Sequence, residues 1–191
     1  MLGGGALYVQ GGTLKLVNTT FAGNTCDTLG PDYAGGAVYA VQMAAPVFVT
    51  NTTFGGIGGS GAGNRAASGG AIGSIGVSWT IVNSRFSVNA AVGTGMSSGN
   101  GGNGGAIYND GNTYTLSLCG TEITANRANE LGGSIFYVSN DLSGTMLLDR
   151  VTSKGNATGK DVQASLHKGI YAEVRDKAGA TGITVTSSTI E

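Results

Sequence analysis

Charge, proline and long apolar runs are scarce in this sequence. Of its 191 residues, 11% are charged, two are prolines, and the formal net charge is −1. Because the basic residues form no cluster, the sequence lacks the electrostatic signature of proteins that bind nucleic acid or anionic lipid. No apolar stretch approaches the ~20 residues of a membrane-spanning helix. We therefore expect no nucleic-acid partner and no membrane span in this segment.

The N-terminus also lacks the pattern of a signal peptide. Met1 is followed at once by Leu2 and three glycines, without a charged region or an apolar region. Scarce charge together with abundant Asn, Thr, Ser and Gly is typical of secreted surface proteins. We expect a segment of a longer extracellular or cell-surface protein, with its signal and anchor outside this chain.

Glycine, by contrast, is abundant, with 36 residues, and 40% of the chain is hydrophobic. Glycine without proline and without a three-residue period excludes collagen. The hydrophobic content and the low net charge argue against disorder. Since Gly, Thr, Ser, Asn and Val are poor helix formers, a helical bundle is also disfavoured. An all-β chain with many tight turns remains.

Two blocks recur along the chain, and the first is a tag of two glycines, a small residue, an aliphatic residue and a ring. The tag occupies residues 4–8, 35–39, 69–73, 104–108, 132–136 and, in degenerate form, 168–171, at intervals of 28 to 36 residues. The second block has two apolar residues at period 2 and a third at an offset of 7 from the first. Its copies are Leu14, Leu16 and Phe21; Val47, Val49 and Phe54; Trp79, Ile81 and Phe86; Leu116, Leu118 and Ile123; and Ile183, Val185 and Ile190. A further copy at residues 146–151 fits with a slip of one or two residues.

Two or three short strands in each unit of roughly 30 residues predict a solenoid, because one unit cannot bury its own apolar face. We expect an all-β, right-handed, single-stranded parallel β-helix of about six coils, forming one domain over residues 1–191. Propeller blades fit less well because they need four strands. Segments 55–68 and 90–103 are predicted to be insertion loops at the same junction of successive coils. Segment 157–191 is expected to be an irregular terminal coil, with a short helix as the open alternative.

Stacked coils place equivalent residues in ladders along the column. Phe21, Phe54 and Phe86 should form an internal aromatic stack, and Arg85 should form an ion pair with Glu122 on the next coil. Asparagine recurs at two turns, where we expect side-chain amide ladders at the first and left-handed backbone angles at the second. The first set is Asn18, Asn51 and Asn83, and the second is Asn24, Asn89, Asn126 and Asn156.

The tag followed by Phe-x-x-Asn, as in Phe21 to Asn24 and Phe86 to Asn89, resembles the repeats of polymorphic outer-membrane proteins and related autotransporter passengers. It is also similar to other bacterial secreted right-handed β-helix proteins. The resemblance covers nearly the whole chain and implies an extracellular adhesin-type module, with no catalytic residues to carry over. Two positions depart from the pattern, Ile57 in place of Asn and Gly73 in place of Tyr.

Carbohydrate-active enzymes also use β-helices, so the acidic residues are possible catalysts. A hydrolase needs converging carboxylates, and a lyase needs a base and a calcium ion held by several carboxylates. Asp110 and Asp141 lie just after the tag strand on neighbouring coils and are the pair to test, and Glu122 is the further acid candidate. Capping of turns is the favoured interpretation of Asp110 and Asp141. We expect no cofactor, and calcium enters only under the lyase alternative.

The remaining reactive side chains point to no site. His167 is the single histidine, which excludes a zinc site built from several histidines, so no metal site is predicted. Cys26 and Cys119 lie three coils apart, roughly 14 Å at ~4.8 Å per coil, too far for a disulfide. Both are expected to be free thiols.

The ring of each tag supplies the ligand-binding candidates. If the aliphatic residue before it points inward, alternation places the ring outward, and the rings form a column on which sugars could stack. These candidates are Tyr8, Tyr39, Tyr108, Phe136 and Tyr171. The alternatives are that the rings point inward or are covered by loops.

The sequence therefore favours a non-catalytic extracellular β-helix module for adhesion or polysaccharide binding. The alternative is a carbohydrate-active enzyme, either a polysaccharide lyase or a glycoside hydrolase. Ice binding is disfavoured because Arg85 and Glu122 interrupt the column that contains Thr20 and Thr53. The expected partners are a polysaccharide or a cell-surface glycan, and uncapped column ends predict end-to-end self-association.

Overall fold

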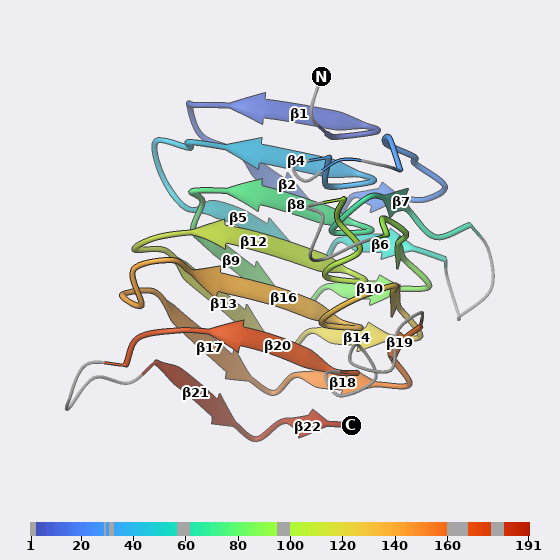
Figure 1. The fold of residues 1–191 in the computed structure, drawn as a ribbon. Coiled ribbons are helices and arrows are strands. Elements are labelled where there is room, and N and C mark those ends of the chain that lie inside the picture. The colour runs from blue at the N-terminus through green and yellow to red at the C-terminus, as the bar shows by residue number, and fades with distance from the viewer. Residues whose placement is uncertain are drawn as a thin grey trace.

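A computed structural model describes residues 3–28, 30, 33–56, 62–94, 100–159, 168–176 and 182–191. The described chain is an all-β parallel solenoid, and every strand pairs with its equivalent in the neighbouring coil (Figure 1). Three sheets contain six strands each, and a fourth, short sheet contains four. The described residues include no helix long and apolar enough to cross a membrane.

The strands of each sheet come from successive coils. The tag sheet contains β1 (Leu7–Gln10), β4 (Val38–Val41), β8 (Ile72–Ile75), β12 (Ile107–Gly111), β16 (Ile135–Ser139) and β20 (Ile170–Glu173). The second sheet contains β2 (Lys15–Val17), β5 (Val47–Thr50), β9 (Trp79–Val82), β13 (Thr115–Cys119), β17 (Thr145–Asp149) and β21 (Ile183–Thr186). The third contains β3 (Thr20–Phe21), β6 (Thr53–Gly55), β10 (Arg85–Ser87), β14 (Glu122–Thr124), β18 (Thr152–Lys154) and β22 (Thr189–Ile190). The fourth contains β7 (Arg65–Ala66), β11 (Ala90–Ala91), β15 (Arg127–Ala128) and β19 (Ala157–Thr158).

The paired glycines of the tag form the corner that leads into the tag sheet. The first glycine has a left-handed backbone, as at Gly69 with φ of 57°. A methyl group on the second, Gly70, would lie 2.3 Å from the carbonyl oxygen of Gly105 and 2.4 Å from the backbone nitrogen of Ala90. Only glycine allows the backbones of the tag and the fourth sheet to approach this closely.

The core is a narrow tube of aligned side chains. Phe21, Phe54 and Phe86 stack with ring centroids 5.1 and 4.7 Å apart and planes within 7° and 8°, which confirms the predicted aromatic stack. The strand register continues this position through Ile123, Ser153 and Ile190. The aliphatic residues of the tags face the same core, and the fully buried ones are Val38, Ile72, Ile107 and Ile135.

The fifth copy of the apolar block follows the common spacing without a slip. Met146 pairs with Leu116 in register, and Ser153 pairs with Ile123. Ser153, not the expected Val151, therefore occupies the third apolar position, where its small side chain is fully buried. A polar residue at an apolar position concealed this regular copy in the sequence.

The roles expected for the two asparagine turns are reversed in the structure. Asn18, Asn51 and Asn83 are exposed and have left-handed φ angles of 53°, 49° and 45°. The amide ladder lies instead at the second turn. There the left-handed φ angle is taken by the residue before the asparagine, as at Val88 with φ of 54°. The ladder runs through Asn24, Asn64, Asn89, Asn126 and Asn156, with amide nitrogen to amide oxygen distances of 2.8 to 3.0 Å.

The two glycine-rich insertions enter at different junctions, so the prediction of a shared junction is wrong. In segment 55–68 the extra residues precede the fourth sheet, because β7 pairs in register with β11. In segment 90–103 they follow it, since β11 opens that segment. Asn64 takes the ladder position expected at residue 57. Ile57, with the rest of 57–61, and residues 95–99 lie outside the described residues.

The end of the chain is more regular than expected. Strands β20, β21 and β22 extend the tag, second and third sheets in register with the preceding coil. The described parts of segment 157–191 therefore form an ordinary coil rather than an irregular one. Residues 160–167 and 177–181 lie outside the described part.

Candidate functional site

The tag rings share one register position on the outer face of the tag sheet. Tyr8 pairs with Tyr39, and Tyr108 pairs with Phe136, which pairs with Tyr171. The aliphatic residue before each ring faces the core, so the rings lie on the opposite side, as alternation requires.

The rings differ in exposure, so the structure combines the two alternatives of an outward column and of rings covered by other segments. Tyr8 is 40% exposed, whereas Tyr39 and Tyr108 are 1% and 7% exposed and pack in a second apolar cluster with Ala34. Phe136 and Tyr171 are half-buried. The chain segment before the second tag, which contains Ala34, packs on this face against Tyr39 and Tyr108.

Gly73 interrupts the column at the position where a ring was expected. It pairs in register with Tyr39 and Tyr108. A methyl group at Gly73 would lie 2.3 Å from the side chain of Ala34, so the covering segment takes the place of the missing ring. Glycine is required at this position by close packing.

The rings of the last three coils stack on one another. Centroids are 5.2 Å apart for Tyr108 and Phe136 and 5.1 Å for Phe136 and Tyr171, with planes within 5° and 10°. Within this group of three, the ring faces that meet cover one another. Tyr8 and Tyr39 are tilted by 36° instead of stacked, at a centroid distance of 5.9 Å. Sugar binding by the tag rings stays a prediction.

Three of the tag tyrosines donate a hydroxyl hydrogen bond to a polar side chain two residues later in the same strand. Tyr8 donates to Gln10 at 3.1 Å, and Tyr108 donates to Asp110 at 3.2 Å. Tyr171 donates to Glu173, and this hydrogen bond, together with burial, raises the pKa of Tyr171 to about 12. The column thus carries a hydroxyl bound to an amide at Tyr8 and hydroxyls bound to carboxylates at Tyr108 and Tyr171.

Asp110 and Asp141 lie at the corner between the tag sheet and the second sheet, and both are bound by neighbouring polar groups. Asp110 accepts from Tyr108 and, at 2.8 Å, from the Asn140 amide. Asp141 accepts from the hydroxyls of Ser143 and Ser139. The hydrogen bond from Ser143 is the main cause of the lowered pKa of Asp141. A carboxyl with a lowered pKa is ionised at neutral pH and is a poor general acid.

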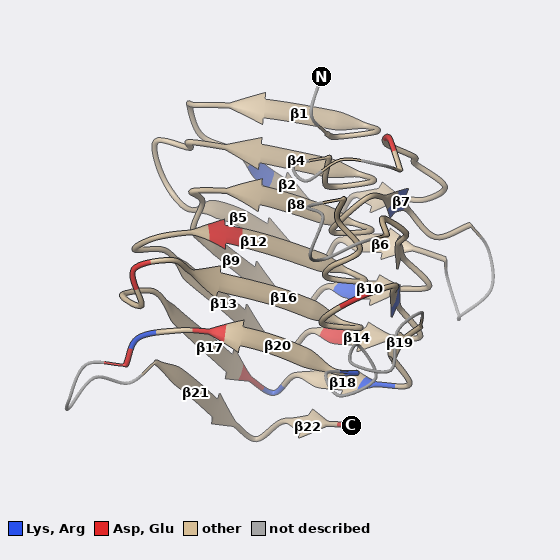
Figure 2. Ribbon diagram, viewed as in Figure 1, with Lys and Arg blue, Asp and Glu red and all other residues tan. Residues whose placement is uncertain are grey.

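The third catalytic candidate lies elsewhere. Glu122 is in the third sheet and forms the predicted ion pair with Arg85, at 2.7 Å between Oε2 and Nη2. Figure 2 shows the acidic residue of β12 and that of β14 on opposite sides of the column. The three candidates therefore do not converge. No group of three metal-ligating side chains occurs among the described residues.

A groove follows the corner that holds Asp110 and Asp141. It has a volume of about 300 Å³ and is lined by Gln42, Ile75, Gly76, Gly111, Asn112, Tyr114 and Asn140. The half-buried Tyr114 ring packs against Gly76 and Gly111, where a methyl group would lie 3.0 and 2.7 Å from it. Tyr114 precedes the second apolar block of its coil, so neither repeated block indicated it. The sequence feature that could have indicated it is an aromatic residue directly after a turn, with a glycine at the corresponding turn of its own coil and of the preceding coil.

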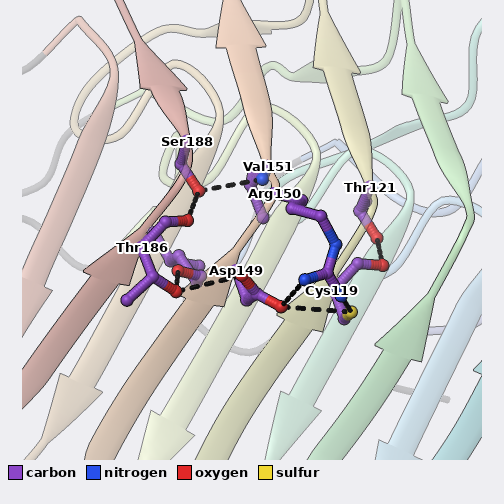
Figure 3. Close-up of polar contacts among 8 residues, drawn as sticks. Cys119, Thr121, Asp149, Arg150, Val151, Thr186 and Ser188 are labelled. Atoms are coloured by element: carbon purple, nitrogen blue, oxygen red, sulfur yellow. Dashed lines mark hydrogen bonds and ion pairs between the residues drawn. The ribbon is translucent and has the colours of Figure 1, made fainter.

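Both cysteines are free thiols, as expected. Burial is the main cause of a raised pKa at Cys26. Cys119 lies in the polar cluster of Figure 3, where Arg150 donates to its sulfur at 2.9 Å and forms an ion pair with Asp149 at 2.7 Å. Asp149 also accepts a hydrogen bond from Thr186, so the cluster joins three coils of the second sheet. His167 lies outside the described residues.

The last coil leaves its interior open. A cavity of about 400 Å³ at this end is apolar in character, and its lining is Met146, Leu148, Ile170, Tyr171, Ala172, Ile183, Val185 and Ile190. End-to-end self-association through these residues stays a prediction.

Comparisons with protein-family profiles, with curated proteins and with solved structures found no match to this chain.

Proposed function

We propose that this chain is a non-catalytic extracellular β-solenoid module that binds a polysaccharide or cell-surface glycan, as in adhesion. The observation that carries the proposal is the groove at the corner between the tag and second sheets. It combines the Tyr114 ring with the side chains of Gln42, Asn112 and Asn140. A ring and several convergent amides are the groups that bind the apolar face and the hydroxyls of a sugar.

The three amide side chains of this groove are exposed, and at least one of them is held in place by hydrogen bonds. Asn140 is held by its hydrogen bond to Asp110, and its backbone nitrogen donates to the carbonyl oxygen of Gly111 at 2.7 Å. Tyr114 is fixed between its glycine contacts and two backbone hydrogen bonds, from its nitrogen to Asn112 and from Thr145 to its oxygen. Preorganised groups lose less conformational entropy when a ligand binds.

The acidic residues support binding rather than catalysis. Asp110 and Asp141 serve as hydrogen-bond acceptors that order the corner, and Glu122 neutralises Arg85 on another sheet. Hydrolysis needs a carboxyl with a raised pKa beside a second carboxylate, whereas the pKa of Asp141 is lowered.

The proposed location of the chain is the surface of a bacterial cell. The repeated tag and Phe-x-x-Asn pattern resemble those of polymorphic outer-membrane proteins and autotransporter passengers, which supports display on a bacterial surface as a right-handed β-helix. A rigid column of stacked coils presents the same face over its whole length, and such a surface suits an extended polymer.

Binding to a glycan array, followed by titration calorimetry on the best ligand, tests the function. Replacing the ring in Tyr114→Ala should weaken binding about two- to tenfold, because an aromatic contact is worth ~0.5–1.5 kcal/mol. The matched control is Leu147→Ala, at a 40% exposed apolar side chain on the second sheet, which should bind as the parent chain does. Release of reducing sugars that stops in Asp110→Asn or Asp141→Asn would instead establish the enzyme alternative.

A further inference from the structure

The fourth sheet carries a second hollow, on a different face from the groove described above. It has a volume of about 370 Å³ and is lined by Arg65, Ala90, Val92, Thr94, Arg127 and Asn129. Figure 1 shows β7 and β19, the two outer strands of this sheet, along the same corner of the column. We call this hollow the arginine cleft.

Its two arginines occupy the same outward position two coils apart. Arg65 pairs in register with Ala90, which pairs with Arg127. The residue after each one, Ala66, Ala91 or Ala128, is fully buried, so the side chains of Arg65 and Arg127 leave the same face of the sheet. Two coils at ~4.8 Å place their backbones about 10 Å apart, and the methyl group of Ala90 leaves the space between them open.

The packing around the cleft holds its walls in place. A methyl group at Gly159 would lie 2.6 Å from Nη2 of Arg127, so glycine makes room for this guanidinium. The Asn129 amide donates to the carbonyl oxygens of Val92 and Gly93 at 2.8 and 3.2 Å, which ties two coils together beside the cleft.

Neither cleft arginine is neutralised within the described part of the chain. Ion pairs there join Arg85 to Glu122 and Arg150 to Asp149, and both cleft arginines are exposed. The nearest carboxylate in sequence, Glu130, is 4% exposed and packs against Gly102. Two cations without an ion-pair partner among the described residues therefore flank an open cleft, in a protein with net charge −1.

We propose that the arginine cleft binds the carboxylate or sulfate groups of an acidic polysaccharide. Guanidinium groups present paired donors that match the two oxygens of these anions. An exposed ion pair contributes at most ~1 kcal/mol, so a single free anion would bind weakly here. A polymer that places anionic groups along the column engages both arginines at once and gains effective concentration. The polysaccharide carrier rests on the function proposed above, whereas the preference for anions rests on the two arginines alone.

Binding of polygalacturonate, dextran sulfate and neutral dextran to immobilised protein at low salt tests the proposal. The wild-type chain should bind both acidic polymers at least about tenfold more tightly than dextran, and the difference should shrink as salt screens the charges. The double variant Arg65→Ala/Arg127→Ala should lose about tenfold in affinity for the acidic polymers, and the doubly conservative Lys variant should retain most of it. The matched control Arg150→Ala removes an exposed arginine from the turn after β17, away from the fourth sheet, and should bind acidic polymers as the wild type does.

Equal affinity of the double alanine variant and the wild type, or equal affinity of the wild type for acidic and neutral polymers, would overturn the proposal. All these side chains are exposed, and an unchanged thermal midpoint confirms that each variant is folded. Inorganic sulfate, followed through the arginine Nε–Hε NMR signals, separates the two proposals. Sulfate shifts without binding of any polysaccharide would overturn the polysaccharide function and keep the anion cleft. Binding of neutral polymers alone, without sulfate shifts, would overturn the cleft and keep the function.

Discussion

The two asparagine turns of each coil use the same residue for opposite purposes. In the third coil, Asn83 is exposed and supplies a left-handed backbone, whereas Asn89, six residues later, is 1% exposed and supplies four hydrogen bonds. At the first turn the side chain is incidental and the backbone angle is needed. At the second turn the side chain is needed and the preceding residue, Val88, takes the angle. Burial therefore decides what an asparagine does in this solenoid.

The buried turn should be far more sensitive to substitution than the exposed one. Asn89→Ala removes the acceptor of the Asn64 backbone nitrogen and amide and the donor to the Phe54 carbonyl. Buried polar groups left without partners cost ~1–3 kcal/mol each, so we expect the free energy of unfolding to fall by about 3–5 kcal/mol. Urea unfolding followed by far-ultraviolet circular dichroism measures this. A loss below about 1 kcal/mol would mean that the amide ladder does not stabilise the column.

The exposed turn should respond to backbone preference alone. Asn83→Ala should lower the free energy of unfolding by about 1 kcal/mol, because alanine is strained at a left-handed φ. Asn83→Gly should lie within about 0.5 kcal/mol of the parent chain, since glycine adopts this angle freely. The matched test is Asn89→Gly, which we expect to be as harmful as Asn89→Ala. If glycine rescued the buried turn, the distinction between the two turns would be lost.

The smallest change in the free energy of unfolding is expected at Val88, a residue poorly suited to a left-handed backbone angle. Val88 is β-branched and has φ of 54°, while the equivalent position in the first coil is Gly23 with φ of 68°. Val88→Gly should raise the free energy of unfolding by about 0.5–1 kcal/mol, because relief of backbone strain exceeds the entropy that glycine loses on folding. The thermal midpoint should rise accordingly. A fall would show that the half-buried valine side chain contributes more through packing than its backbone costs.

Much of the fold could be predicted from the sequence because the coil repeats in the sequence itself. The tag indicated the strand that each coil contributes to the tag sheet. The offset of 7 between apolar residues predicted that Phe21, Phe54 and Phe86 form one stack. The pairing of Arg85 with Glu122 followed from the same offset. Each of these predictions used spacing within a stretch that has no insertion.

The candidate site could be predicted only in part. Alternation placed the tag rings outward, but nothing in the spacing indicated that a neighbouring segment buries Tyr39 and Tyr108 while Tyr8 stays exposed. The groove at Tyr114 depends on Gly76 and Gly111, which belong to different coils, and on the shape of the turns around them. The spacing of apolar residues carries no information about the shape of a turn. Asp110 and Asp141 were expected just after the tag strand; Asp110 lies within β12 and Asp141 two residues after β16. The partners of Asp141 are local serines, whereas the contact of Asp110 with Asn140 joins neighbouring coils and could not be read from spacing.

The sequence by itself determined the period of the solenoid and the residues of its core, because each coil must present apolar side chains at fixed spacing to the next. Tertiary structure alone decided the alignment across the insertions. Arg65 lies 11 residues after Phe54, whereas Arg127 lies 4 residues after Ile123, and no common spacing relates them. Backbone hydrogen bonds between parallel strands restore the register after an insertion of any length, and so bring these arginines to one face.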